Sequence, residues 1–87
     1  MAKKITIYTM DYCPYCVRAK QLLDRRGYNY EEIKIDPNNP QIWAKMEERS
    51  GMKTLPQIFF DQKCIGGYSD LEAIDKRGEL TKLLESE

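Results

Sequence analysis

The sequence contains no histidine among its 87 residues. Nucleophilic sites that use an imidazole base, of the Ser-His-Asp or Cys-His kind, are therefore excluded within this chain. The usual nitrogen ligand of zinc is also missing, and three cysteines alone do not complete a four-ligand structural zinc site. We therefore expect no metal site and no tightly bound cofactor.

An excess of charge of one sign and long apolar runs are also lacking. The chain carries 14 basic and 14 acidic side chains, whereas a nucleic-acid-binding domain shows a basic stripe or a basic excess. No stretch approaches the roughly 18 to 20 apolar residues of a membrane span. The first residues include two lysines but no apolar segment typical of a signal peptide. We expect a cytoplasmic protein that binds neither nucleic acid nor membrane.

Cysteine is scarce, with three residues in the chain. An odd number of cysteines makes a poor disulfide scaffold, so the fold has to depend on an apolar core. A chain of this length buries only a modest core. We find no internal repeat, low-complexity tract or linker, and we expect residues 1–87 to form a single domain.

Hydrophobic patterning predicts eight elements, in the order strand, helix, strand, helix, strand, strand, helix, helix. The expected strands cover residues 3–9, 28–35, 55–60 and 63–66, and the expected helices cover residues 14–26, 40–50, 69–77 and 80–84. The first strand–helix–strand unit should be parallel and right-handed, and the later hairpin adds antiparallel pairing. The sequence therefore predicts an α/β fold with a four-stranded mixed sheet flanked by helices. Ser69 and Glu72 match a capping box, which makes Ser69 the expected N-cap of the third helix.

The strongest chemical signal is Cys13-Pro14-Tyr15-Cys16, at the start of a helix that follows a strand. Cysteines at i and i+3 share a helix face, which allows a short disulfide between them. Cys13 precedes the helix, where free N–H groups and the helix dipole stabilise a thiolate, the attacking species in thiol–disulfide exchange. Cys16 is one turn further in and suits the resolving role. The alternatives are half of a metal knuckle, which lacks further ligands, and a structural disulfide, which fits poorly with a cytosolic chain.

Three motifs together resemble the glutaredoxin family over nearly the whole chain. They are the dithiol motif Cys13-Pro14-Tyr15-Cys16, the segment Thr54-Leu55-Pro56, which is similar to the family's Thr-Val-Pro loop, and Gly66-Gly67-Tyr68-Ser69-Asp70-Leu71, which is similar to its Gly-Gly-x-x-Asp-Leu segment. The order and spacing of the motifs match the family, and the overall pattern is nearest the compact bacterial-type members. The resemblance implies a thioredoxin fold.

The resemblance also implies a glutathione site, with glutathione as co-substrate. In this analogy Pro56 is cis, and the Leu55 backbone pairs with the backbone of the glutathione cysteine, like one rung of a sheet. The γ-glutamyl carboxylate lies near Gly67, Ser69 and Asp70, where the N-terminus of a helix offers N–H donors to an anion. The Asp70 carboxylate takes the γ-glutamyl ammonium. Thr54 belongs to the same loop as Leu55, and Tyr15 flanks the ligand.

The chain departs from the family pattern at Met10. Many glutaredoxins carry a lysine three residues before the nucleophilic cysteine, where it helps to bind the glycine carboxylate of glutathione. Its replacement implies weaker binding of glutathione. Arg49 is a candidate to supply the missing contact, and Asp11 adds a negative charge that disfavours a nearby thiolate.

The third cysteine, Cys64, falls in the last predicted strand. We expect it to be a small buried hydrophobe without a catalytic role, and a regulatory oxidation site is the alternative. The function expected from the resemblance is glutathione-dependent reduction of disulfide-containing or glutathionylated proteins by a monomer. Three alternatives stay open: a redoxin reduced by a flavin-dependent reductase, a module that binds an iron–sulfur cluster between two Cys13 thiolates, and a protein with a purely structural disulfide.

Overall fold

A computed structural model describes residues 3–85 of the chain. Within these residues, four strands form one sheet, and their order is β2-β1-β3-β4. The strands are β1 (Ile5–Thr9), β2 (Glu31–Lys34), β3 (Gln57–Phe60) and β4 (Lys63–Gly66), and the helices are α1 (Pro14–Arg25), α2 (Pro40–Ser50), α3 (Tyr68–Lys76) and α4 (Leu80–Glu85). β1 pairs with β2 in parallel, whereas β3 pairs antiparallel with both β1 and β4. The predicted mixed sheet is confirmed.

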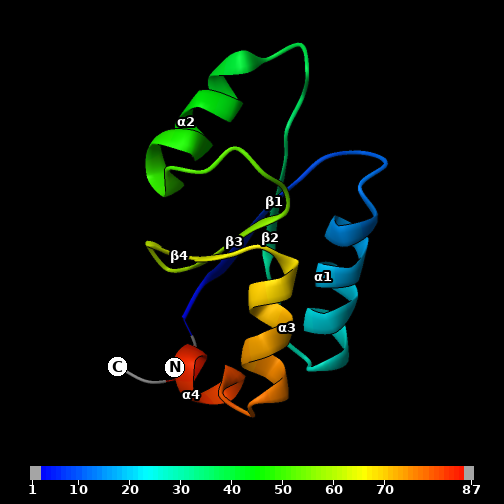
Figure 1. Cartoon of the computed structure of the whole chain (residues 1–87), viewed down its shortest axis with the longest axis vertical. Helices are drawn as coiled ribbons and strands as arrows, with labels where there is room; N and C mark the ends of the chain where they lie inside the picture. Colours follow the sequence, from blue (N-terminus) through cyan, green and yellow to red (C-terminus); the bar gives the residue numbers. More distant parts are fainter. Residues whose placement is uncertain (1–2, 86–87) are drawn as a thin grey trace.

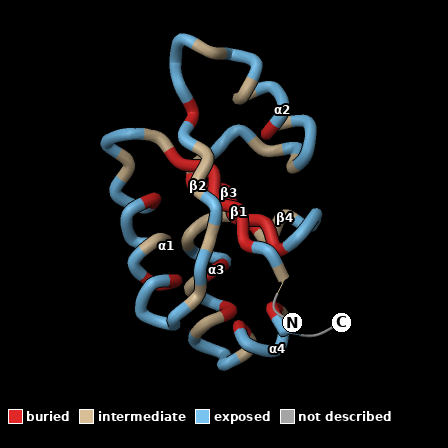
Figure 2. Tube along the Cα trace, turned by 180° about the vertical axis from the view of Figure 1, so that it is seen from behind, coloured by how far each residue is buried: buried red, intermediate tan, exposed pale blue. Residues whose placement is uncertain are grey.

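The helices cover the two faces of the sheet unequally (Figure 1). Ile5 and Ile7 of β1 pack with α1, α3 and α4 on one face, in the larger of two apolar clusters. Tyr8 of β1 and Phe59 of β3 belong to the smaller cluster, which contains Met46 of α2. This division follows from the two-residue period of a strand, which sends successive side chains to opposite faces. Figure 2 shows the buried residues concentrated along the central strands, between the two helical layers.

Helix α1 is held by the apolar stripe that its sequence predicted. Cys16, Ala19 and Leu23 are buried, and Leu22 extends the stripe. Figure 1 shows α1 and α3 side by side on the same face of the sheet. Burial of each leucine contributes about 1.5 to 3 kcal/mol, which fixes the helix and therefore the position of its N-terminus.

Several predicted boundaries were wrong by one to three residues: the first and third strands, for example, begin at Ile5 and Gln57, two residues later than expected. Two other differences have a visible cause. The second strand begins at Glu31 and not at Tyr28, because the Tyr28 N–H donates to the carbonyl of Leu23 at 3.0 Å and closes the end of α1. Helix α3 begins one residue before Ser69, with Gly67 as its N-cap. Glu72 does not complete a capping box with Ser69 and instead accepts a hydrogen bond from the Tyr68 hydroxyl at 2.8 Å.

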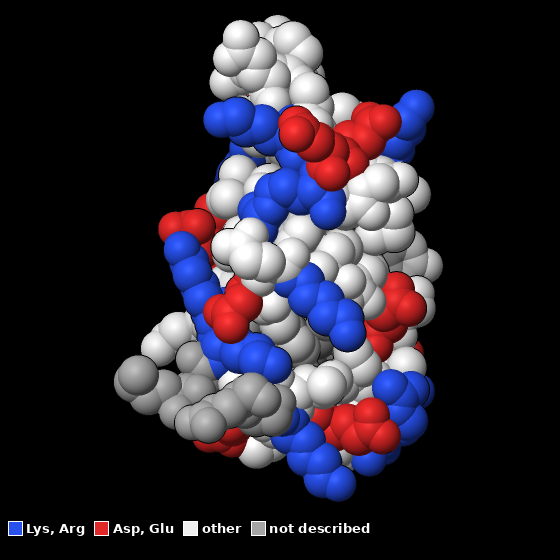
Figure 3. All heavy atoms as spheres, turned by 90° about the vertical axis from the view of Figure 1, so that its left-hand side faces the viewer, with Lys and Arg blue, Asp and Glu red and all other residues white. Residues whose placement is uncertain are grey.

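Charged side chains of both signs lie on the face of the molecule shown in Figure 3. On the face shown in Figure 3, blue basic and red acidic side chains are interspersed over α2 and around the sheet edge. Seven ion pairs are formed among the described residues, and most of them are exposed. None of the helices within residues 3–85 is both long and apolar enough to cross a membrane.

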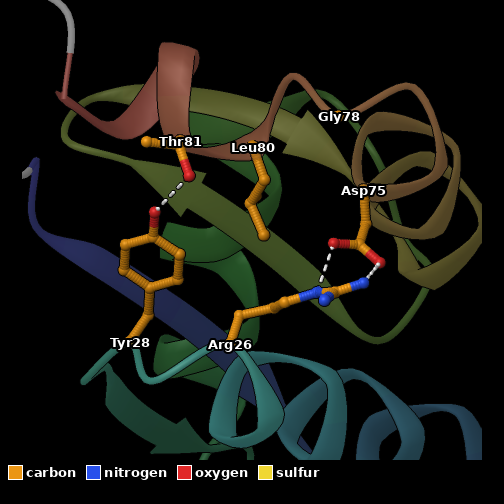
Figure 4. Close-up of a pocket in the computed structure, with 6 residues that line it drawn as sticks. All are labelled: Arg26, Tyr28, Asp75, Gly78, Leu80 and Thr81. Atoms are coloured by element: carbon orange, nitrogen blue, oxygen red, sulfur yellow. Dashed lines mark hydrogen bonds and ion pairs between the residues drawn. The ribbon is translucent and has the colours of Figure 1, made fainter.

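One ion pair ties the end of α1 to α3. The Arg26 guanidinium donates two hydrogen bonds to the Asp75 carboxylate, at 2.7 and 2.9 Å, and the Asp75 side chain is only 14% exposed. Tyr28 and Thr81 join the same region to α4 through a hydroxyl–hydroxyl hydrogen bond of 3.0 Å (Figure 4). These contacts line a pocket at the end of the molecule formed by α3 and α4. The pair holds α1 and α3 together beyond their apolar contact.

We expect Asp75→Asn to lower the free energy of unfolding near neutral pH. The bond to Arg26 lowers the pKa of Asp75 below its ordinary value of 3.8. The stabilisation is therefore fully present above that value and is lost as the pH falls through the folded-state pKa. Denaturant unfolding from about pH 6 to about pH 2 should show the difference between wild type and variant shrinking in acid.

A matched control is Glu48→Gln, which removes an exposed carboxylate from α2. It should leave the stability unchanged over the same range of pH. A difference between wild type and Asp75→Asn that persists at the acid limit would contradict the assignment, because the Asp75 carboxyl is then protonated and as uncharged as the amide that replaces it.

Candidate active site

The loop between β1 and α1 presents Cys13 at the tip of the helix. Tyr12, immediately before it, has a left-handed backbone (φ 62°) and a fully exposed side chain. Such a conformation is costly for a residue with a side chain and is typical of functional loops. Cys13 itself is extended (φ −108°, ψ 102°) and is the N-cap of α1, and Pro14 occupies the first helical turn. The proline fits there because the N–H that it lacks would have no partner in the helix.

The Cys13 sulfur takes the place of the oxygen in an ordinary N-cap. Its Sγ accepts a hydrogen bond from the Cys16 N–H at 3.3 Å. The positive end of the α1 dipole and the unpaired N–H groups of the first turn lie at the same point. A half-buried sulfur with this donor can carry negative charge and still be reached from solvent. The arrangement suits a nucleophilic thiolate.

Cys16 is in the opposite situation, with a side chain only 1% exposed. Burial raises the pKa of its thiol to about 12, and a hydrogen bond to Cys13 and the charge of Cys13 act in the same direction. A hydrogen bond from the Met10 backbone and the charge of Lys20 lower the pKa in part. Cys16 therefore stays protonated while Cys13 is free, as the predicted division of roles requires.

A groove of about 320 Å³ opens beside the first turn of α1. All seven residues that the family resemblance suggested as glutathione contacts line it: Tyr15, Thr54, Leu55, Pro56, Gly67, Ser69 and Asp70. The Leu55–Pro56 peptide bond is cis, as the resemblance implied. Met52 and Tyr68 also line the groove and were not predicted. Their proximity to Thr54 and Gly67 in sequence was the only available signal.

At Gly67 the groove is lined by main-chain atoms and no side chain. A Cβ added to Gly67 would lie 3.2 Å from the carbonyl oxygen of Pro56, so a side chain there would crowd the loop. The Asp70 carboxylate accepts a hydrogen bond from the Gly67 N–H at 3.0 Å. This bond caps α3, which leaves the N–H groups of Tyr68 and Ser69, in the first turn, as donors for an anion.

Aromatic rings form one wall of the groove. The rings of Tyr15 and Tyr68 lie 6.0 Å apart, and the Arg18 guanidinium lies 5.4 Å from the centre of the Tyr15 ring. The loop that contains Thr54 and Pro56 also lines the groove. Its start is fixed by the buried Gln57, whose amide donates to the Met52 carbonyl at 3.0 Å.

The structure gives no support to the expectation that Arg49 contacts the ligand. Arg49 does not line the groove. Its guanidinium donates to the Tyr8 hydroxyl at 2.7 Å and stacks 4.3 Å from the centre of the Phe59 ring, on the α2 side of the sheet. Met10 packs half-buried against the same cluster, and Asp11 is paired with Lys34 at 3.2 Å. No arginine or lysine is among the described residues that line the groove.

Cys64 lies apart from the groove and packs, half-buried, against the smaller apolar cluster. Burial raises the pKa of its thiol, which disfavours the reactive thiolate. No group of three or more cysteine or carboxylate side chains within residues 3–85 is arranged to hold a metal ion. Cys13 at the tip of α1 and the buried Cys16 one turn behind it are therefore the candidate pair for thiol chemistry.

Comparison with known proteins agrees with this geometry. The sequence model of the glutaredoxin family, described as "Glutaredoxin", matches residues 5–65. Glutaredoxin 3 of Escherichia coli (strain K12) is 51% identical over 83 residues, covering 92% of this chain and 95% of that protein. The solution structure of glutaredoxin from Brucella melitensis is 44% identical with a TM-score of 0.81, covering 95% of this chain and 89% of that one.

A third relative is a crystal structure of a buckwheat glutaredoxin–glutathione complex. It is 28% identical with a TM-score of 0.84, and the match covers 95% of this chain and 77% of that one. The family model covers well over half of the chain, and the bacterial relatives match nearly all of it. The chain belongs to the glutaredoxin family of thiol–disulfide oxidoreductases.

Proposed function

We propose that this glutaredoxin reduces protein disulfides and glutathione mixed disulfides through Cys13 and Cys16, with glutathione as the electron source. The observation that carries the proposal is the pairing of a reachable Cys13 sulfur at the tip of α1 with a buried, protonated Cys16 one turn behind it. The groove beside them offers a place for the tripeptide.

The reaction begins when the Cys13 thiolate attacks one sulfur of a protein disulfide. A Cys13–protein disulfide forms, and the other protein sulfur leaves as a thiolate that takes a proton from water. The Cys16 thiolate then attacks the Cys13 sulfur and releases the protein as a dithiol. Two glutathione molecules reduce the Cys13–Cys16 disulfide and become glutathione disulfide. A glutathionylated target needs Cys13 alone for the first transfer.

The groove supports glutathione as the partner. The Leu55 backbone beside cis-Pro56 suits a sheet-like pairing with the cysteine of the tripeptide. The γ-glutamyl group carries both a carboxylate and an ammonium, which suit the N–H groups at the start of α3 and the Asp70 carboxylate. Tyr15 and Thr54 flank the ligand in this arrangement. A buckwheat relative has been solved as a glutathione complex.

The proposed reaction indicates where in the cell the protein works and on which targets. Glutathione keeps thiols reduced in the cytoplasm, which favours a cytoplasmic location. The targets are disulfide-containing or glutathionylated proteins, and the proposed steps need one copy of the chain.

We expect Cys16→Ser to retain reduction of a small glutathione mixed disulfide and to lose reduction of a protein disulfide, because only the second reaction needs a resolving thiol. Cys13→Ser should lose both, since a buried thiol of pKa about 12 cannot replace the nucleophile. Glutathione-coupled turnover of the two substrates measures this. Retained activity without Cys13 would refute the assignment of the nucleophile, and turnover only with a flavin-dependent reductase would refute the reductant.

We expect Asp70→Asn to raise the KM for glutathione about fivefold, because an exposed charge-assisted contact is worth about 1 kcal/mol. The asparagine oxygen can still accept from the Gly67 N–H, so the cap of α3 is preserved. Glu48→Gln, on the far helix α2, is the matched control and should leave the KM unchanged. An Asp70→Asn variant with a wild-type KM would exclude the ammonium contact.

We expect Met10→Lys to lower the KM for glutathione about two- to fivefold by restoring a cation near the glycine carboxylate. None of the described residues that line the groove is an arginine or lysine that would already supply this charge. Steady-state kinetics with varied glutathione, at low and high salt, tests it, because a surface charge effect weakens with salt. An unchanged KM at low salt would show that position 10 does not reach the ligand.

A further inference from the structure

The resolving step poses a problem for Cys16. Its sulfur must ionise to attack, yet its side chain is almost completely buried and its pKa is about 12. Part of this cost disappears once Cys13 is captured as a mixed disulfide, because the Cys13 sulfur then carries no charge. The influences that favour the Cys16 thiolate remain in place: the Met10 backbone and the charge of Lys20.

Lys20 is placed by the helix itself. It follows Cys16 by four residues on α1, so the two side chains lie on neighbouring turns of the same face. The Lys20 side chain is only 26% exposed, unlike most lysines of this chain that form ion pairs. Its ammonium is therefore shielded from water more than an ordinary surface charge.

Two further residues hold the Lys20 ammonium in place. The Glu32 carboxylate of β2 accepts a hydrogen bond from Lys20 Nζ at 2.9 Å, and the same oxygen accepts a hydrogen bond from the buried Thr9 hydroxyl at 2.6 Å. These contacts raise the pKa of Lys20 and lower the pKa of Glu32, so both groups stay charged at neutral pH. Thr9 ends β1, and the next residue, Met10, contributes the backbone hydrogen bond to Cys16.

We propose that Lys20, held by Glu32 and Thr9, is a positioning residue for the resolving step, where its ammonium stabilises the Cys16 thiolate. The proposal rests on the proposed function, because it needs Cys13 to form a mixed disulfide that Cys16 resolves. It concerns the second half of protein-disulfide reduction and not the first attack by Cys13.

The step balances without a new reactant. Solvent hydroxide takes the Cys16 proton, and the resulting thiolate attacks the Cys13 sulfur. The Cys13–Cys16 bond forms as the bond from Cys13 to the target sulfur breaks. The target leaves as a thiolate and takes a proton from water. Lys20 remains an ammonium throughout, so it supplies a field and no proton.

Other titratable groups act on this network. Glu32 is the counter-charge of Lys20, and Lys34 is a second cation that acts on Glu32. Tyr30 acts on Lys20, and Asp24 acts on Tyr30. Burial raises the pKa of Tyr30, so its hydroxyl stays neutral at neutral pH. Lys20 is the cation that lowers the pKa of Cys16.

The expected change in the rate of the resolving step is modest, and its direction follows from the charge that is removed. Loss of the Lys20 charge raises the pKa of Cys16 and therefore lowers its thiolate fraction at neutral pH. A more basic thiolate is a better nucleophile, and a Brønsted coefficient of about 0.4 to 0.5 recovers about half of that loss on a logarithmic scale. We therefore expect Lys20→Met to slow resolution about two- to fivefold. Glu32→Gln should speed it, because the amide oxygen still accepts from Lys20 and Thr9 while the counter-charge is gone.

The experiment follows the two phases of thionitrobenzoate release from the aromatic disulfide dithiobis(nitrobenzoate), in stopped flow, in a Cys64→Ser background. The first phase reports attack by Cys13, and the second reports release by Cys16. The variants are Lys20→Met, Lys20→Arg, Glu32→Gln and, as a surface control, Lys45→Met. Each is measured over a range of neutral to alkaline pH, with circular dichroism to confirm that it is folded.

The proposal expects a slower second phase in Lys20→Met, a rate near wild type in Lys20→Arg and Lys45→Met, and a faster one in Glu32→Gln. A second phase unchanged in Lys20→Met, or slowed alike in Lys20→Met and Glu32→Gln, would overturn it, since a purely structural pair loses rate in both variants. If Lys20→Met does not fold, Glu32→Gln still decides the question, because a slower second phase in that variant would overturn the proposal. A second phase that survives in Cys16→Ser would instead refute the proposed function.

Discussion

The position of the first turn of α1 is the constraint on which the rest of this protein depends. Cys13 is at once the N-cap of the helix and the proposed nucleophile, so the interaction that starts the helix also fixes the position of that sulfur. The cap stays in position because Ala19 and Leu23 bury the same helix against the sheet. Loss of either apolar anchor would therefore disturb the chemistry as well as the stability, because the N–H donor and the sulfur it serves belong to one rigid body.

The topology gathers the remaining parts of the site at the same end of the sheet. β1 ends at Thr9, and antiparallel β3 begins beside it, with Tyr8 opposite Gln57. β4 in turn ends beside the start of β3, with Gly66 opposite Ile58. The loop before β3 and the turn after β4 consequently meet next to the loop after β1. The directions of the strands therefore place Cys13 beside the groove, and no long insertion is needed to bring them together.

Local patterns in the sequence were sufficient to predict the order of elements, the sheet and the placement of Cys13 and Cys16 at the start of α1, because capping, proline placement and periodicity act over a few residues. The environment of Arg49 could not be predicted because distant groups hold it: Tyr8 and Phe59, across the sheet. The start of α3 was misplaced by a local competition between two caps, in which Asp70 accepts from the Gly67 N–H three residues before it. The Lys20–Glu32 pair joins α1 to β2 and has no local signal at all. Groove residues were found through family motifs, which encode such distant contacts indirectly.

The unequal covering of the two sheet faces has a consequence for how this sequence can diverge. Helix α2 buries one side chain completely, Met46, whereas α1 buries four. Its remaining positions face solvent or make partial contacts, and none of them lines the groove. Substitutions accumulate most freely where neither packing nor chemistry opposes them. The outer surface of α2 can accordingly acquire new recognition properties without disturbing the groove beside α1.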